Sequence, residues 1–354
     1  MMKSVAAVPQ QRIVPLDEAL MQQAQARLDR LTKPLGSLGY LEVLARQIVG
    51  ITGTLAPRMD QKVVITIAAD HGVAIEGVSA YPQLVTAQMV DNFLRGGAAI
   101  NVLVRHVGAR IVVVDMGVAA KIAAHPRLCL RKISSGTKNM AQEAAMSREE
   151  ACRAIQIGRE LVEEELKVGL DLLGIGEMGI GNTTAASAIT ALMTKSPVHQ
   201  VTGRGTGVDD ATFARKLAVI KRALEVNRPD PNDPLDVLAK VGGFEIAGLV
   251  GVMLAAAQAR RVVVVDGFIA GAAALIATGL EPTLGAYLIA SHCSKEPGHR
   301  VILDHLGLRP LLDLQLRLGE GTGAALAMPI IEAACKILTE MATFEEAGVA
   351  VTSV

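Results

Sequence analysis

The sequence contains no tryptophan, and aromatic residues make up only 2% of its 354 residues. Proteins that bind single-stranded nucleic acid usually stack the bases on aromatic side chains beside basic groups. No basic block replaces the missing aromatics, because 35 basic and 35 acidic residues give a formal net charge of zero. The composition therefore predicts that the protein has no nucleic-acid partner.

Closely spaced metal ligands are also absent. The four cysteines are Cys129, Cys152, Cys293 and Cys335, and no Cys-x-x-Cys pair occurs. His292, His299 and His305 lack the helical i, i+4 spacing of a metal-binding pair. Isolated thiols are ordinary in a reducing compartment. The sequence thus predicts no metal site and a cytoplasmic location.

The first 20 residues lack the apolar segment of a signal peptide. The longest apolar stretches elsewhere are interrupted by charged residues such as Glu245 and Asp266. A membrane-spanning helix needs about 20 mostly apolar residues in a row. We therefore expect a soluble protein with no membrane partner.

Hydrophobic residues, at 51%, and 34 glycines are abundant enough to build a large, tightly packed core. Short β-branched runs alternate with helical patterns, which is typical of parallel sheets covered by helices. The expected strands are 63–68, 110–115, 128–133, 170–175, 262–266 and 286–290, and the expected helices between them include 83–105, 147–167, 209–226 and 235–258. The predicted fold is α/β: a doubly wound, mainly parallel six-stranded sheet of Rossmann-like type.

The two ends of the chain show helical patterns without strands. Helices are expected at 16–31 and 40–52, before the first strand, and again from 300 onward, including 324–342. We therefore predict a large α/β domain at 61–299, which holds the substrate cleft. Residues 1–60 together with 300–354 are predicted to form a small helical domain.

Residues 170–193 are the most informative stretch. A short strand at 170–175 is predicted to enter a glycine-rich loop and to leave as a helix, with Asn182 or Thr183 as its N-cap. Backbone N–H groups and the helix dipole at such a junction favour an anion. The glycines of this loop are Gly174, Gly176, Gly179 and Gly181.

The same glycines leave alternatives open. Gly174-x-Gly176-x-x-Gly179 also fits the dinucleotide fingerprint, which would make the protein an NAD-type oxidoreductase. Glu177 opposes that interpretation, because its charge would face the pyrophosphate. A purely structural turn is a further alternative. A carboxylate inside the loop favours contact with a substrate.

Polar residues follow several of the expected strands, and ligands bind beyond the carboxyl ends of strands in open α/β sheets. Structural roles are the alternative for some of them, as helix caps for Asp70 and Asp115 and as a buried partner for His71. The set that should converge on one cleft is Asp70, His71, Asp115, Glu177, Asp266 and Ser294.

Glu320 is the second carboxylate candidate. It lies between Gly319 and Gly321, so it has no neighbouring side chain to pack against, and it is either exposed or turned toward a ligand. Glu177 is also flanked by glycine-rich sequence. In a partly apolar pocket the pKa of such a carboxyl rises, which suits a general base.

Four motifs together resemble one enzyme family, the nicotinate-nucleotide–dimethylbenzimidazole phosphoribosyltransferases. The motifs are TKPLGSLG at 32–39, ADHG at 69–72, GIGEMGIGNTTAASA at 174–188 and LGEGTGAALAMP at 318–329. The resemblance runs from about Arg27 to Gly348, which is nearly the whole chain. It implies transfer of phosphoribose from nicotinate mononucleotide to 5,6-dimethylbenzimidazole, giving α-ribazole 5′-phosphate and nicotinate for the lower ligand of cobalamin.

The resemblance also implies residue roles. Glu320 matches the general base, and Glu177 matches a second active-site glutamate. Tyr81 and Gln88 correspond to the benzimidazole pocket, and Asp266 to a position near the ribose. Residues that match the nucleotide and phosphate site are Gly179, Ile180, Gly181, Asn182, Thr183, Lys216, Gly267 and Ser294. The family implies a homodimer and no cofactor.

Two other functions stay open on the sequence alone. One is the dinucleotide-dependent oxidoreductase that uses 174–179, which does not require Glu320. The other is a non-catalytic nucleotide-binding sensor on the same fold, which would have no need of a base at that position.

Overall fold

The computed structural model describes residues 12–350, and its centre is a six-stranded sheet in which every neighbouring pair is parallel. The strand order is β3-β2-β1-β4-β5-β6. Most strand residues are buried, and β-branched residues dominate the first and fifth strands, as expected for a sheet covered on both faces. The strands are β1 (Lys62–Ala69), β2 (Arg110–Gly117), β3 (Leu128–Leu130), β4 (Leu172–Met178), β5 (Val262–Val265) and β6 (Leu288–Ala290). The predicted fold class is confirmed.

The strand order reverses between β1 and β4. From β1 the chain moves outward through β2 to β3, and it then returns to β4 on the other side of β1. Ile67 of β1 pairs with Glu177 of β4, so the two strands end beside each other. Ligands of doubly wound sheets bind at such a switch point, beyond the carboxyl ends of the strands.

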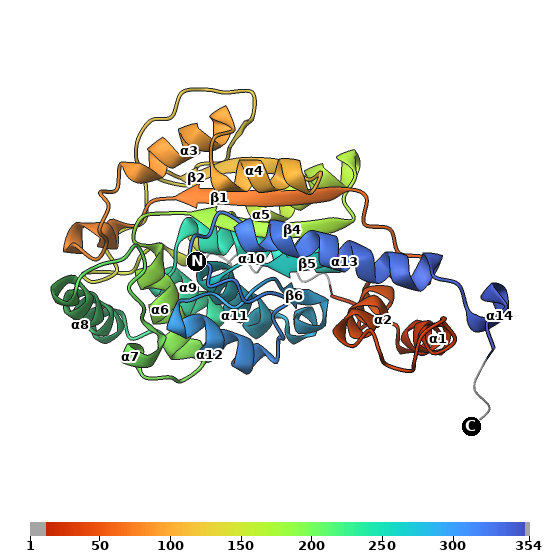
Figure 1. The fold of residues 1–354 in the computed structure, drawn as a ribbon. Helices are drawn as coiled ribbons and strands as arrows, with labels where there is room; N and C mark the ends of the chain where they lie inside the picture. Colours follow the sequence, from red (N-terminus) through yellow and green to blue (C-terminus); the bar gives the residue numbers. More distant parts are fainter. Residues whose placement is uncertain (1–11, 351–354) are drawn as a thin grey trace, which may run out of the picture.

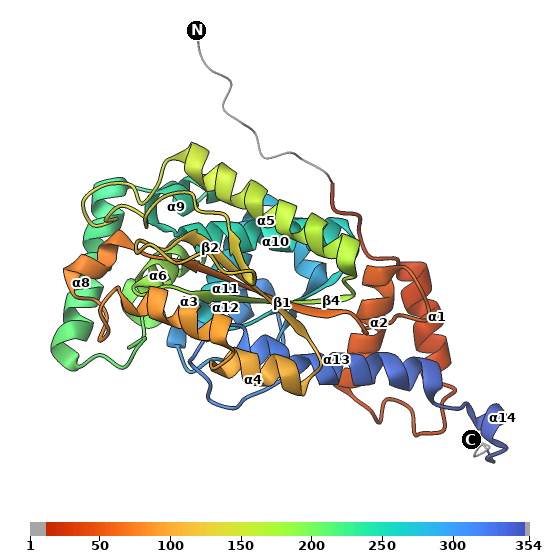
Figure 2. The ribbon, with the colours of Figure 1, turned by 90° about the horizontal axis from the view of Figure 1, so that it is seen from above.

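Helices cover both faces of the sheet (Figure 2). α10 (Phe244–Gln258) and α11 (Phe268–Leu280) pack on one face, with α5 (Arg148–Val168) outside α10. α3 (Val85–Arg95), α4 (Ala99–His106) and α13 (Thr322–Glu340) pack on the other face. The remaining elements are η1 (Gly72–Glu76), α6 (Asn182–Met193), α7 (Val198–Val201), α8 (Asp210–Asn227), α9 (Pro234–Val241), η2 (Pro282–Tyr287), α12 (Pro297–Leu306) and α14 (Phe344–Ala347).

α1 (Glu18–Leu28) and α2 (Tyr40–Thr52) form an arm at the end of the molecule where the strands begin (Figure 1). α13 joins this arm to the body, because it contacts α2 as well as β1, β4 and β5. By length and composition α13 could span a membrane, but more than half of it is buried in the protein. It is a core helix. The division into domains at 61–299 and at 1–60 plus 300–354 stays a prediction.

Two of the expected helices are interrupted. The segment 83–105 divides into α3 and α4 because Gly96 adopts a left-handed φ of 82°. The segment 235–258 divides into α9 and α10 at Gly242 and Gly243, where added Cβ atoms would meet Leu238 and His71.

The expected loop after residue 175 is also corrected. β4 continues to Met178, so Gly174, Gly176 and Glu177 are strand residues. The missing Cβ atoms of the two glycines make room for α13 and for the turn that carries Glu320. The dinucleotide fingerprint instead places its first glycine in the turn after the strand. Gly181, with φ 96°, precedes α6, so neither Asn182 nor Thr183 is the N-cap.

α5 and α10 cross at glycines, so their backbones touch directly. A Cβ on Gly158 of α5 would collide with the carbonyl oxygen of Gly248, and one on Gly251 of α10 would collide with that of Ile155. Every substitution at these positions has to separate the helices.

We predict that Gly158→Ala lowers the free energy of unfolding by about 1–3 kcal/mol, because overpacking outweighs the gain in helix propensity. Urea denaturation measures it. Gly285→Ala is the control, since nothing lies within 4 Å of its added Cβ. It should change stability by less than about 0.5 kcal/mol. Equal effects of the two changes would contradict the proposed crossing.

Candidate active site

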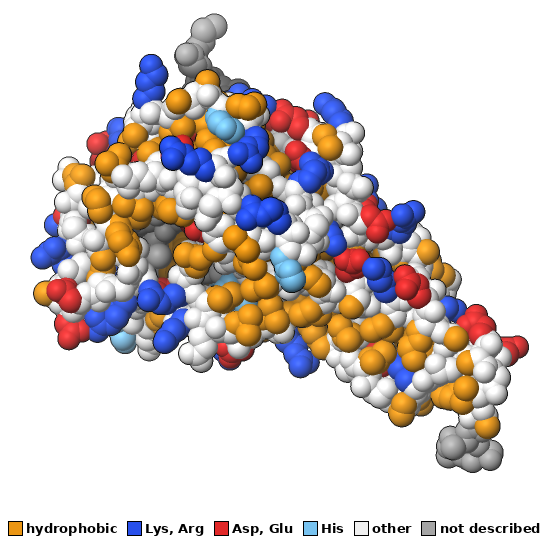
Figure 3. Space-filling model, turned by 45° about the horizontal axis from the view of Figure 1, so that its top comes forward, with side chains coloured by type: hydrophobic (Ala, Val, Ile, Leu, Met, Phe, Trp, Pro, Cys, Tyr) orange, Lys and Arg blue, Asp and Glu red, His pale blue; other side chains and the backbone are white. Residues whose placement is uncertain are grey.

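A cavity of about 560 Å³ opens beyond the carboxyl ends of β4, β5 and β6. Its size lies within the range of small-molecule sites. Figure 3 shows the surface hollowed toward the end of the molecule opposite the arm, with hydrophobic side chains on the rim. The cavity is lined by Tyr81, Val85, Met89, Glu177, Met178, Gly179, Ile180, Asn182, Thr183, Gly205, Thr206, Gly267, Phe268, Ile269, His292, Ser294, Glu296, Gln315, Leu316, Arg317, Leu318, Gly319 and Glu320.

Glu177 lines the cavity from the C-terminal end of β4 and is 6% exposed. The side-chain amide of Asn182, at the start of α6, donates a hydrogen bond to Glu177 Oε2. Burial, together with nearby carboxylates, raises the pKa of Glu177 to about 8. At neutral pH this carboxyl is mostly protonated, so it can donate a hydrogen bond.

Glu320 lies in a turn with three consecutive left-handed residues. The φ angles are 89° at Gly319, 64° at Glu320 and 95° at Gly321. Left-handed backbone is unfavourable for a residue with a side chain, so contacts around Glu320 must hold it there. The turn presses onto β4, where any Cβ on Gly176 would collide with the Glu320 carbonyl.

Hydrogen bonds fix both the backbone and the side chain of Glu320. Its carbonyl accepts from Thr66 Oγ1 at 2.9 Å, and its N–H donates to the Glu177 carbonyl at 3.2 Å. The N–H of Ile100, in α4, donates to Glu320 Oε2 at 3.2 Å. Burial raises the pKa of Glu320, and the Ile100 bond opposes this. The turn therefore presents a fixed carboxyl to the cavity beside Glu177.

Asp266 supports the same turn from the end of β5. Its carboxylate accepts from Gly321 N at 3.2 Å and from Ala324 N at 3.0 Å, and so it receives N–H groups at the start of α13. Burial nevertheless raises the pKa of Asp266 to about 7. Asp266 does not line the cavity. It lies directly behind the Glu320 turn and directly before Gly267, which does line it.

Four of the five residues at 179–183 line the cavity, and Gly181 does not. Lys216, from α8, lies behind them and is 1% exposed. Its Nζ donates to Thr183 Oγ1 at 2.7 Å and to the Gly203 carbonyl at 3.3 Å. Burial lowers the pKa of Lys216 to about 8. Thr183 and Gly205, which line the cavity, lie next to this cation and separate it from the open space.

The remaining predicted residues divide into two groups. Gly267 and Ser294 line the cavity, and Tyr81, which is 55% exposed, lies at its mouth. Gln88 is exposed on α3 and does not line the cavity. Val85 and Met89, one helical turn apart on the same helix, face the cavity instead.

Three of the polar residues at the strand ends have structural partners outside the cavity. His71 Nε2 lies 2.6 Å from Glu245 Oε1, and both side chains are buried. Asp70 accepts from Ala119 N at 2.7 Å, and Asp115 accepts from Val118 N at 2.8 Å. The expected convergence of strand-end residues is therefore only partial.

Some cavity residues were missed by the sequence analysis. His292 and Glu296 flank Ser294, and Gln315–Arg317 directly precede the Glu320 motif, so nearness to a motif was the available signal. The glycine-rich stretch at 203–207 contributes Gly205, whose φ is 52°.

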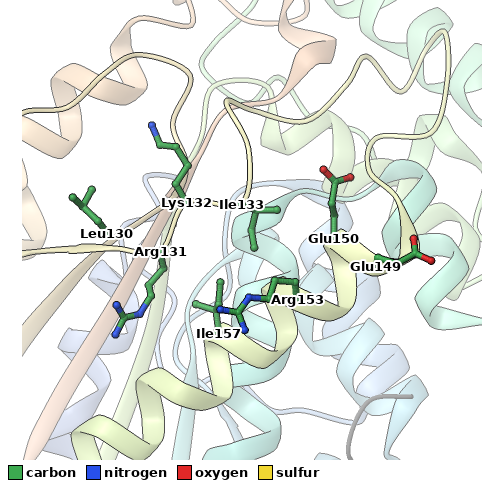
Figure 4. A pocket seen from close by; sticks show the side chains of 8 residues that line it. All are labelled: Leu130, Arg131, Lys132, Ile133, Glu149, Glu150, Arg153 and Ile157. Atoms are coloured by element: carbon green, nitrogen blue, oxygen red, sulfur yellow. The ribbon is translucent and has the colours of Figure 1, made fainter. Parts of the chain in front are cut away.

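A second hollow, of about 630 Å³, lies between the edge strand β3 and the start of α5. It contains none of the predicted site residues. Figure 4 shows Arg131 and Lys132 pointing in opposite directions, so the basic groups do not converge. Arg131 instead pairs with Glu164, and Lys132 with Asp115. The strand-end cavity is thus the candidate active site.

Residues 13–349 match the family model described as Phosphoribosyltransferase. A nicotinate-nucleotide–dimethylbenzimidazole phosphoribosyltransferase from Roseiflexus sp. (strain RS-1) is 62% identical over 338 residues, which cover 96% of each chain. One from Desulforudis audaxviator is 60% identical over 339 residues, again 96% of each. The crystal structure of the enzyme of that name from Thermus thermophilus has a TM-score of 0.91 and 48% identity, covering 95% of this chain and 100% of that one.

The raised pKa of Glu177 predicts a pH-dependent stability. An unfolded Glu loses its proton near pH 4.5, whereas the folded protein keeps this one to about pH 8. The folded state is therefore progressively disfavoured as pH rises from about 5 to about 8. Glu177→Gln removes this penalty, and its stability relative to the unchanged protein should rise by about 3 kcal/mol over that range. Urea unfolding at both pH values measures it. The exposed Glu163→Gln control should show no rise in stability with pH. If Glu177→Gln also shows no rise, the raised pKa of Glu177 is refuted.

Proposed function

The chain belongs to the nicotinate-nucleotide–dimethylbenzimidazole phosphoribosyltransferase family, and from this we propose how its cavity transfers phosphoribose from nicotinate mononucleotide to 5,6-dimethylbenzimidazole. The products are α-ribazole 5′-phosphate and nicotinate, in the assembly of the cobalamin lower ligand. Neither alternative, the dinucleotide-dependent oxidoreductase or the sensor, receives support from the relatives, which carry the transferase name over nearly their full length.

One observation carries the proposal: two buried carboxyl groups meet in one cavity of nucleotide size. Glu177 comes from the sheet, and Glu320 comes from a strained turn. A backbone hydrogen bond joins the turn to the carbonyl of Glu177. Strained residues that are held by many contacts are frequent at active sites. A buried cation, Lys216, lies behind the same cavity.

Glu320 is proposed as the general base. One nitrogen of the benzimidazole attacks ribose C1′, while the N–H proton of its other nitrogen passes to the Glu320 carboxylate. The bond between C1′ and the nicotinate nitrogen breaks, and its electron pair neutralises the pyridinium. Attack on the face opposite the leaving nicotinate inverts the configuration from β to α.

Glu177 is proposed as the second active-site carboxyl. Its raised pKa keeps it protonated at neutral pH, so that it does not compete with Glu320 for the transferred proton. In that state it can donate a hydrogen bond to the nucleotide. Asp266 is proposed to act near the ribose by holding the Glu320 turn and the chain that leads to Gly267.

The phosphate is proposed to bind at Gly179–Thr183, at the start of α6, where helix N–H groups and the helix dipole favour an anion. Lys216 would supply the cation and would exchange its bond to Thr183 for one to phosphate. A bound phosphate favours the charged lysine and so raises its pKa back from about 8. Gly267 and Ser294 are proposed to contact the rest of the nucleotide.

The benzimidazole is proposed to bind near Tyr81 and Gln88, at the exposed side of the cavity. Val85 and Met89 give this region apolar contact area of the kind a flat aromatic base requires. Gln88 would reach the base from the rim of α3.

We also propose a cytoplasmic homodimer. Figure 3 shows hydrophobic side chains running from the middle of the molecule along the arm, where Leu35 is 75% exposed. The small helical domain, residues 1–60 and 300–354, is proposed to complete the cleft by contributing Glu320. Light scattering during size-exclusion chromatography would reveal a monomer if the dimer is wrong.

The product assay tests the reaction. Purified protein is mixed with nicotinate mononucleotide and 5,6-dimethylbenzimidazole, and the mixture is resolved by chromatography and mass spectrometry. Equal amounts of nicotinate and α-ribazole 5′-phosphate are expected, and their absence would reject the assigned reaction.

For Glu320→Gln we predict a fall in kcat of about 10²-fold or more, because the amide cannot accept the proton. The Kd for nicotinate mononucleotide should change less than about threefold, since Glu320 is not proposed to hold the nucleotide. Glu340→Gln, at the exposed far end of α13, the helix that follows the Glu320 turn, is the control and should retain full activity. An unchanged kcat in Glu320→Gln would remove the residue from its role.

For Lys216→Ala we predict that the Kd of nicotinate mononucleotide rises about 10- to 100-fold, the usual range for a lost charged hydrogen bond. Calorimetry measures it. Nicotinate riboside, which lacks the phosphate, should bind both proteins equally. Lys221→Ala, on the exposed side of the same helix, should bind the nucleotide normally. A matching loss of riboside affinity would show that Lys216 does not act on the phosphate.

A further inference from the structure

His292 lines the cavity between β6 and α12, and the mechanism above does not use it. The residue is 2% exposed. Its Nδ1 atom lies 2.8 Å from Ser291 Oγ and 3.9 Å from Asp266 Oδ1. Gly323, in the first turn of α13, packs against the ring so closely that any Cβ on it would collide with Nδ1. The ring is therefore held tightly on this side.

These contacts decide which ring nitrogen carries the proton. The Ser291 hydroxyl donates its single hydrogen to the Asp266 carbonyl at 3.0 Å. Ser291 Oγ can therefore only accept from His292, which requires a hydrogen on Nδ1. The Asp266 carboxylate, also on that side, favours the same arrangement. Burial lowers the pKa of His292 to about 4, so the ring is neutral and Nε2 carries a lone pair.

Nε2 makes no hydrogen bond with the described residues. A Cβ on Gly267 would lie 3.7 Å from Nε2, so the missing side chain leaves space in front of it. The neighbouring Ser294 hydroxyl is already engaged, because it donates to the Leu316 carbonyl at 3.2 Å and accepts from Glu296 N at 3.3 Å. His292 Nε2 is therefore an open acceptor on this wall, whereas the Ser294 hydroxyl is not.

Helix α11 begins at the same place, with Phe268 and Ile269 also lining the cavity. N–H groups in the first turn of a helix have no partner within the helix. A group that both donates and accepts a hydrogen bond fits between these amides and Nε2, and a hydroxyl is such a group. A phosphate or carboxylate does not fit, because its oxygens would face the Nε2 lone pair.

We propose that His292 Nε2 accepts a hydrogen bond from a ribose hydroxyl of the nucleotide and makes the enzyme selective for that hydroxyl. This inference rests on the proposed function, because it takes the cavity to be the nucleotide site. His292 is thereby a substrate-binding residue, and Ser291 is the positioning residue that fixes its tautomer.

The test compares nicotinate mononucleotide with its 2′-deoxy and 3′-deoxy analogues by calorimetry. In the unchanged enzyme, one analogue should bind about tenfold more weakly, because it leaves Nε2 unpaired. His292→Asn keeps an amide where Nδ1 lies but has no atom at Nε2, and in it that tenfold difference should disappear. The affinity for the other analogue, relative to nicotinate mononucleotide, should stay as it is in the unchanged enzyme.

His305→Asn is the matched control, since His305 is exposed on the neighbouring helix. The affinities for both analogues, relative to nicotinate mononucleotide, should be the same in it as in the unchanged enzyme. If the deoxy analogues lose as much affinity in His292→Asn as in the unchanged enzyme, the inference is overturned while the reaction stays intact. The absence of any penalty in the unchanged enzyme would also overturn it. Failure of nicotinate mononucleotide itself to bind would instead reject the proposed function, and this inference with it.

A second measurement needs no variant. Nitrogen-15 NMR of histidine-labelled enzyme should show His292 with a protonated Nδ1 and a bare Nε2, and the Nε2 signal should shift when the nucleotide binds. A protonated Nε2 in the free enzyme would overturn the inference, even if His292→Asn failed to fold.

Discussion

The candidate site depends on one close backbone contact, between β4 at Gly176 and the turn that carries Glu320. No side chain fits between them, and the turn is left-handed at three residues in succession. Thr66, Glu177 and Asp266 hold the turn against the sheet through hydrogen bonds. These contacts offset the conformational cost of placing a carboxyl at a fixed point beside Glu177.

The electrostatics of the cavity follow from the same packing. Burial raises the pKa of Glu177, Glu320 and Asp266 together, and it lowers the pKa of Lys216. Each charge is disfavoured until a substrate supplies its complement. A nucleotide that carries a phosphate and a positively charged pyridinium ring offers both signs at once, which suits a pocket that has both buried acids and a buried amine.

Much of the fold was predictable because its signals are local. Short apolar runs, β-branched in β1, β2 and β5, predicted six strands in a parallel sheet, and glycines around Glu320 marked it as a candidate. Tertiary contacts were not predictable. Gly174 and Gly176 have the composition of a loop, yet they lie in β4 because α13 and the Glu320 turn approach them closely. Asp266 likewise has the sequence position of a residue that faces a ligand. Only the structure shows that its carboxylate accepts a hydrogen bond from the backbone N–H of Ala324, in the first turn of α13.

The wall of the cavity that is proposed to hold the acceptor base is built from other elements than the two glutamates proposed to act in the reaction. Val85 and Met89 belong to α3, and Tyr81 to the exposed segment before it, whereas both glutamates are fixed by the sheet. The Ile180–Thr86 hydrogen bond joins α3 to the segment 179–183, which is proposed to bind the phosphate, but the Glu320 turn is held by other elements. The proposed base pocket and the proposed catalytic residues therefore depend on different parts of the fold. If these assignments hold, substitutions on α3 can adapt the pocket to a new base while Glu177 and Glu320 keep their geometry.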